Sequence, residues 1–134
     1  MKKVIIILSL LISFIYAEKG RSVTVTEYDT DHGSGLSCLY LFTTRGIDKH
    51  GDGFIAIRSG PGSKYSIKNK FVKNGKQVVG CDSVGNWIGI IYADKDTWQG
   101  CGLDSDSSEK THPYRGPCKT GWVYKKYLKD QLAG

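Results

Sequence analysis

The chain has 134 residues, and its 19 lysines and arginines outnumber its 13 acidic residues, giving a formal net charge of +6 at pH 7. This length fits one small domain with a thin hydrophobic core. A mildly basic surface favours anionic partners, but the basic residues are scattered among acids instead of forming a stripe, so we expect no nucleic-acid partner.

Residues 1–17 are predicted to be a secretory signal peptide. A short basic start, Met1-Lys-Lys3, precedes an apolar run from Val4 to Ile15, and Ala17 is a small residue at a plausible cleavage point. The apolar run is shorter than the roughly 18 to 20 residues that span a bilayer. We therefore expect an exported protein, periplasmic or secreted, with no stable membrane insertion after cleavage.

The residues after this leader predict an extension and then a strand. Alternation within Ser22–Tyr28 indicates a short strand, whereas the glycines and small polar residues of 29–35 are typical of a linker. Residues 18–37 are therefore expected to be an N-terminal extension. Aromatic and β-branched residues predict a strand at Cys38–Thr44, and the polar run 48–53 is expected to be a hairpin turn into the next strand.

The next strand, 54–58, places Ile55 and Ile57 on one face, with Ala56 and Arg58 on the other. Glycine supplies a positive φ and proline fixes φ without offering a ladder donor, so a turn is expected after this strand. That turn consists of Ser59, Gly60, Pro61 and Gly62.

A second hairpin is predicted from residues 76–81 and 87–92. Both faces of 87–92 are apolar, so we expect this strand to be covered on both sides, by the sheet interior and by a folded-back loop from the later insertion. Residues 121–128 are expected to complete the sheet with a short 3₁₀ turn at 125–128. No segment after the leader has a helical apolar period, which predicts an all-β chain.

All four cysteines follow the leader, and an even number in an exported chain indicates two disulfides. Three pairings are possible. We favour Cys101–Cys118, which brackets a polar stretch, and Cys38–Cys81, which would tie an N-terminal strand to the rest of the sheet. In the chain-entropy model, closing each loop is worth roughly 3 to 4 kcal/mol. The cysteines form no close C-x-x-C pair, which argues against a metal site.

Five short motifs follow one another in an order that is similar to the bacterial SH3 (SH3b) family. They are Ile-x-Ile-Arg-Ser-Gly-Pro-Gly62, Ser-x-Tyr65, Lys73-Asn-Gly75, Gly85-Asn-Trp87, and Lys119-Thr-Gly-Trp-Val123 with Tyr127-Leu128. Each motif is weak alone, but their order is specific. The chain resembles exported family members with a disulfide-closed insertion. The resemblance implies a small SH3-like β-barrel at 38–129, with an insertion at 93–118 and a C-terminal tail at 130–134.

Domains of this family usually bind ligands and do not catalyse reactions. The resemblance therefore implies an exported, non-catalytic binding module of the bacterial cell envelope, recognising peptidoglycan peptide or sugar. The alternative is a protein–protein interaction module, such as an inhibitor or an immunity-type partner of a secreted enzyme. Positions expected to serve the scaffold are Arg58, Ser59, Gly60, Pro61, Gly62, Trp87, Gly121 and Trp122.

Four positions are the candidate ligand contacts. Tyr65 follows the Gly-Pro-Gly turn at the expected rim, where its ring can stack on a peptide or sugar. Trp98 and Tyr114 lie in the polar insertion, for which the alternative is that they pack the insertion onto the barrel. Arg58 can pair with a carboxylate, although outward-facing strand arginines are usually just solvated.

The sequence offers no assembled metal site or catalytic centre. The acidic stretch at 48–59 has His50 and Ser59 at ligand places of the calcium-loop template, and the stretch at 104–115 lacks the central glycine and ends at Arg115. No G-x-S-x-G elbow occurs, and oxidised cysteines would leave no thiolate to pair with a histidine. We expect no metal, no cofactor and no enzymatic activity.

Overall fold

The computed structural model describes residues 19–30, 33–36, 38, 40–95, 98–103 and 111–131. The predicted signal peptide and the acidic part of the insertion, 104–109, lie outside the described residues, as does most of the predicted tail. Among the helices of the described chain, none is long and apolar enough to cross a membrane.

The described residues form β-strands and two single-turn 3₁₀ helices, so the prediction of an all-β chain is confirmed. The elements in chain order are β1 (Thr24–Thr30), β2 (Gly33–Leu36), β3 (Tyr40–Thr44), β4 (Ile55–Arg58), β5 (Ile67–Phe71), β6 (Gln77–Val84), β7 (Trp87–Tyr92), η1 (Trp98–Cys101), β8 (Thr111–Pro113), β9 (Lys119–Tyr124), η2 (Lys125–Tyr127) and β10 (Leu128–Asp130).

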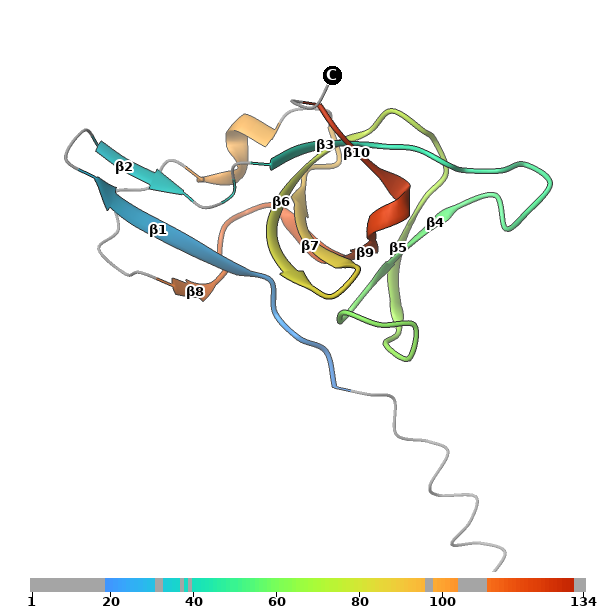
Figure 1. Cartoon of the computed structure of the whole chain (residues 1–134), viewed down its shortest axis with the longest axis horizontal. Helices are drawn as coiled ribbons and strands as arrows, with labels where there is room; N and C mark the ends of the chain where they lie inside the picture. The colour runs from blue at the N-terminus through green and yellow to red at the C-terminus, as the bar shows by residue number, and fades with distance from the viewer. Residues whose placement is uncertain are drawn as a thin grey trace, which may run out of the picture.

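The strands form two antiparallel sheets. The larger has the order β10-β3-β6-β7-β9-β4-β5, and the smaller has the order β2-β1-β8. Figure 1 shows the large sheet curling strongly, with the small sheet beside it and with β4 and β5 on the side away from β1 and β2. Within the described chain the large sheet is open, because β10 and β5 are its edge strands.

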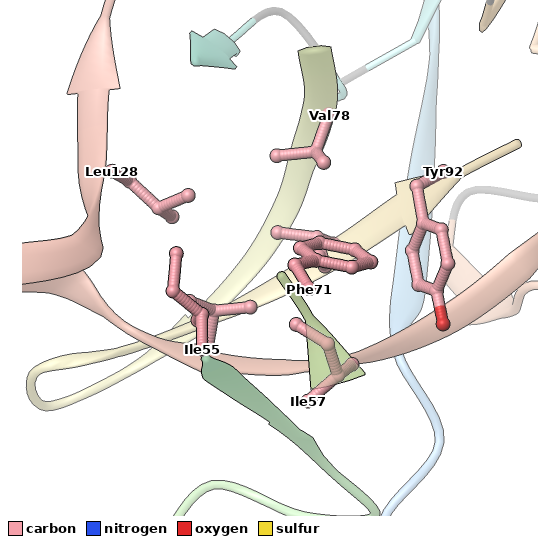
Figure 2. Packing of buried hydrophobic residues seen from close by; sticks show 8 residues of the cluster. Ile55, Ile57, Phe71, Val78, Tyr92 and Leu128 are labelled. Atoms are coloured by element: carbon pink, nitrogen blue, oxygen red, sulfur yellow. The ribbon is translucent and has the colours of Figure 1, made fainter. Parts of the chain in front are cut away.

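The concave face of the large sheet encloses one hydrophobic cluster, the inner core. Figure 2 shows Phe71 among the aliphatic side chains, with Tyr92 beside it. The Phe71 and Tyr92 rings meet edge to face at 4.9 Å between centroids, a favourable geometry for two aromatic quadrupoles. The inner core consists of Ile55, Ile57, Phe71, Val78, Ile90, Tyr92, Val123 and Leu128.

The convex face carries a second cluster, the outer core, and this explains why β7 is apolar on both sides. Ile90 and Tyr92 belong to the inner core, whereas Ile91 packs outward, as the alternation of the strand predicts. The cover comes from the N-terminal segment, η1 and the ends of the insertion. The buried members of the outer core are Val23, Val25, Val79, Ile91, Cys101, Leu103 and Trp122.

Two expectations about strand pairing were wrong. The strand at 40–44 does not form a hairpin with the strand at 55–58, because both edges of β3 are already hydrogen-bonded, to β6 and to β10. The stretch expected to be a linker contains β2, which pairs with β1 in a hairpin. The extension is therefore a structured part of the fold, and β1 also pairs with β8 from the insertion.

The central hairpin and the closing turn form where predicted, but β6 runs to Val84, three residues beyond the expected end of the strand. β6 and β7 pair around Gly85 and Asn86, with a register shift between Gly80 and Asp82 that marks a bulge at Cys81. The 3₁₀ turn η2 then connects β9 to β10. Ile55 and Ile57 are both fully buried on the inner face, as the strand pattern requires.

Candidate functional site

The two disulfides join the pairs favoured by the sequence, and they use all four cysteines. Cys38–Cys81 connects a residue two positions before β3 to the bulge of β6, with 4.1 Å between Cα atoms. Cys101–Cys118 connects the end of η1 to the segment before β9, with 5.2 Å between Cα atoms. Each bond therefore fixes the end of a segment against the large sheet.

Tyr114, a candidate ligand contact, holds the insertion together. Its hydroxyl donates to the carbonyl oxygen of Cys101 at 2.5 Å and accepts the backbone N–H of Cys118 at 3.2 Å. The ring packs against the outer core, and a Cβ at Gly116 would lie 2.3 Å from the Tyr114 hydroxyl. The hydroxyl thus bridges the two halves of the Cys101–Cys118 disulfide.

The tryptophans also serve packing. Trp122 is fully buried, and its indole N–H donates to the carbonyl oxygen of Arg21 at 2.8 Å. Trp87 and Trp98 are partly buried against the same outer core. The described contacts of Trp98 and Tyr114 show both residues packing the insertion onto the sheet, which was the alternative considered for them.

Arg58 and Tyr65 meet across the turn that follows β4. The Arg58 guanidinium donates to the carbonyl oxygen of Tyr65 at 2.8 Å. The Tyr65 ring lies across the turn so closely that a Cβ at Gly60 would be 2.3 Å from it. Glycine at position 60 of the Arg-Ser-Gly-Pro-Gly motif is therefore required by this packing, since a larger residue there would displace the Tyr65 ring.

The four candidate contacts form two pairs, which the described contacts do not join into one rim. Arg58 with Tyr65 belongs to the turn after β4, and Trp98 with Tyr114 belongs to the outer core. The two regions approach one another at a small cavity of about 240 Å³, which has Tyr114 on one wall and Ser59 on another.

A larger groove lies at the end of the large sheet where β3, β6 and β10 meet. Its volume is about 640 Å³. At its mouth Tyr40 is 58% exposed and stacks on Phe42, with ring centroids 6.2 Å apart and an interplanar angle of 21°. We call this the Tyr40 groove; it is lined by Tyr40, Phe42, Gly80, Cys81, Asp82, Ser83, Ile88, Lys125, Leu128 and Asp130.

The polar wall of the Tyr40 groove is fixed in place. Asp82 accepts both the backbone N–H and the hydroxyl of Thr24 through one carboxylate oxygen, at 3.2 and 2.7 Å. Its other oxygen accepts the N–H of Ser83 at 2.8 Å. Cys81, also in the wall, is held by its disulfide to Cys38. A groove with such fixed walls loses little entropy when a ligand binds.

The sequence interpretation missed the Tyr40 groove because it searched for exposed aromatic residues in the insertion. The available signal was the alternation of β3, which places Tyr40 and Phe42 on the same face of the strand. The β3–β6 pairing then brings this face to Gly80, which leaves room for the Phe42 ring: a Cβ at Gly80 would lie 2.4 Å from it.

Comparison of the chain with protein-family models, with curated proteins and with solved structures finds no match. Within the described residues, no group of three or more histidine, cysteine or acidic side chains is placed to hold a metal ion. The interpretation of the site therefore depends on its own geometry.

Proposed function

We propose that this chain is an exported, non-catalytic binding module of the bacterial cell envelope, built on an SH3-like barrel, and that it recognises peptidoglycan peptide or sugar. The order of the five sequence motifs supports the barrel and the family. Two disulfides support an oxidising compartment, because such bonds persist mainly in exported proteins.

The observation that carries the proposal is the Tyr40 groove. Its volume lies in the range of small-ligand pockets, roughly 300 to 1,000 Å³. The exposed Tyr40 ring, supported from behind by Phe42, offers an apolar face on which a sugar ring or a peptide side chain can stack. Asp82 and Lys125 at the margin provide hydrogen-bonding groups of both signs for peptide amides, amines or hydroxyls.

Retention of the oxidised protein on purified, lipid-free cell-wall sacculi tests the proposal. We expect the wild type to be retained and Tyr40→Ala to bind about tenfold more weakly, which corresponds to roughly 1.4 kcal/mol. Val72→Ala is the matched control, because Val72 is also an exposed large hydrophobic residue but lies outside the groove. Equal retention of the two variants would exclude the groove as the site.

The second candidate, a protein–protein interaction module, is favoured by the bracing of the insertion. The Cys101–Cys118 bond, the Tyr114 hydroxyl and the pairing of β8 with β1 hold both ends of the insertion on the sheet. A loop braced in this way can act as a preorganised recognition element. Absence of retention on sacculi, together with a defined secreted enzyme that binds the chain, would favour this candidate.

A further inference from the structure

The chain between Gly53 and Cys81 contains no acidic residue and six basic ones, which are Arg58, Lys64, Lys68, Lys70, Lys73 and Lys76. In this segment the basic residues are therefore not interspersed with acidic ones, unlike in the chain as a whole. This segment contains β4, β5 and the start of β6, and β5 is an edge strand of the large sheet. The edge strand β5 contributes Lys68 and Lys70, and Lys73 and Lys76 follow it before β6 begins.

Three of these lysines converge on one hollow of about 450 Å³ beside the end of β5. We call it the lysine hollow; it is lined by Asn69, Lys70, Phe71, Val72, Lys73, Asn74, Gly75, Lys76, Tyr92 and Asp94. Asp94, the acid in this lining, is ion-paired with Lys119 at 2.8 Å, and this hydrogen bond lowers the pKa of its carboxyl group. The charge of Asp94 is therefore balanced by Lys119, and the hollow stays positive.

The backbone that carries these lysines is held by a buried residue. Thr44 is 2% exposed, and its carbonyl oxygen accepts the N–H of Gly75 at 2.8 Å, while its hydroxyl oxygen accepts the N–H of Lys76 at 3.0 Å. The Lys76 ammonium is in turn directed by donating to the carbonyl oxygen of Ala93 at 2.9 Å. Among the described residues, Lys70 and Lys73 form no ion pair. The Lys70 ammonium lies over the Phe54 ring at 4.4 Å from its centroid, a contact that does not neutralise its charge. The charges of Lys70 and Lys73 can therefore pair with an anionic partner outside the chain.

An exposed aliphatic residue lies among these charges. Val72, which directly follows β5, is 66% exposed, and Ile67 at the start of β5 is 41% exposed. Strand alternation in β5 places Lys70 on the face opposite the buried Phe71. The outer core, which covers the convex face of β6, β7 and β9, includes no residue of β4 or β5. In Figure 1 this hairpin lies on the side of the sheet away from β1 and β2.

We propose that this edge, from Lys70 to Lys76 with Val72 at its centre, binds the surface of an anionic phospholipid membrane. Lipid phosphates occupy the lysine hollow, and the Val72 side chain enters the boundary between headgroups and acyl chains. Positive charge alone would also fit a soluble polyanion. The exposed Val72 favours a lipid membrane, because a soluble polyanion has no apolar layer in which the Val72 side chain could be buried. This contact is peripheral and independent of the Tyr40 groove.

Co-sedimentation of the oxidised chain with lipid vesicles tests this proposal. We expect binding to phosphatidylglycerol vesicles, little binding to phosphatidylcholine vesicles, and loss of binding at high salt. The double variant K70E/K73E should bind at least about 25-fold more weakly, since each lysine near an anionic surface contributes roughly fivefold. The control K126E/K129E makes the same change in net charge at two exposed lysines of η2 and β10, and should bind nearly as the wild type does.

A third variant separates lipid from other anions. Val72→Ser should weaken vesicle binding about tenfold, because burial of about two aliphatic carbons is lost. Equal weakening by K70E/K73E and K126E/K129E would overturn the proposal, since vesicle binding would then depend only on the net charge of the chain. Unchanged vesicle binding of Val72→Ser, with full competition by inorganic polyphosphate, would overturn it in favour of a soluble polyanion.

The Tyr40→Ala variant tests whether the membrane contact is independent of the Tyr40 groove. Vesicle binding at the wild-type level would show that the two sites are separate, and loss of vesicle binding would contradict their independence.

Discussion

Gly121 lies in β9 directly against Ile57 of the inner core, and the space between them admits no side chain. A Cβ at Gly121 would lie 2.3 Å from the Cγ2 atom of Ile57, which is fully buried. We predict that Gly121→Ala lowers the free energy of unfolding by about 1 to 3 kcal/mol, the usual range for overpacking. Gly100→Ala is the control, because nothing lies within 4 Å of a Cβ at that position. Urea denaturation of the two variants measures the difference, and equal midpoints would contradict this packing.

Tyr92 gives the stability of the fold a specific dependence on alkaline pH. Burial raises the pKa of its hydroxyl above the usual value of about 10, while the hydrogen bond from Asn69 acts in the opposite direction. Above pH 10, the unfolded chain loses this proton before the folded chain does, so the free energy of unfolding falls as the pH rises. At lower pH Tyr92 keeps its proton in both states and does not contribute to the pH dependence of the free energy of unfolding.

We predict that Tyr92→Phe removes this component of the alkaline destabilisation. The free energy of unfolding, measured with urea at a series of pH values from about 8 to about 11, should fall less steeply for Tyr92→Phe than for the wild type. Parallel curves for the wild type and Tyr92→Phe would show that burial of Tyr92 does not shift its titration.

At the scale of elements, the Cys101–Cys118 bond fixes η1 and the segment before β9 to the outer core. Its ends are 17 residues apart, for which loop closure contributes about 3 kcal/mol. We predict that the double variant C101S/C118S loses about this much stability in urea, and that C38S/C81S, with a separation of 43 residues, loses about 4 kcal/mol. A loss below about 1 kcal/mol for C101S/C118S would mean that the Tyr114 hydrogen bonds and the β8–β1 pairing hold the insertion without the disulfide.

The elements that the sequence could predict are those whose pattern is local. Alternation located β4 and the β6–β7 hairpin, and the two apolar faces of β7 correctly required a cover on both sides. The pairing of β3 could not be predicted from its neighbours in the chain, because its partners β6 and β10 follow it at a distance. Glycine-rich residues 33–36 lack a strand pattern, and β2 depends on its pairing with β1.

The candidate site was predictable to a smaller extent, because exposure is a property of the assembled sheet. Tyr114 lies in a polar stretch, yet its hydroxyl bonds across a disulfide that the sequence could only propose. Tyr40 lies in a strand whose apolar sequence predicts burial, yet its side chain is exposed at the open end of the sheet. The local polarity of the sequence therefore placed the expected binding site in the insertion, whereas the packing of the sheet favours the Tyr40 groove.

At the scale of the whole molecule, two hydrophobic cores share one sheet, so we expect them to unfold together. β6 contributes Val78 to the inner core and Val79 to the outer core, and β7 contributes to both in the same way. All three tryptophans of the chain belong to the outer core, whereas Phe71 and Tyr92 belong to the inner core. Tryptophan fluorescence thus reports on one core, and backbone circular dichroism reports on the whole sheet.

Val23→Ala tests this coupling from the N-terminal segment. Val23 is 2% exposed against the outer core, and loss of two buried carbons should cost about 1.5 to 2.5 kcal/mol. If the shared sheet couples the cores, fluorescence and circular dichroism will report one urea transition, shifted equally in both signals. If the N-terminal segment and the insertion were separate layers on an independent sheet, the fluorescence transition would move to lower urea while circular dichroism retained most of its amplitude. The single shift follows because β6 and β7 cannot lose their outer cover without exposing strands whose other face holds the inner core together.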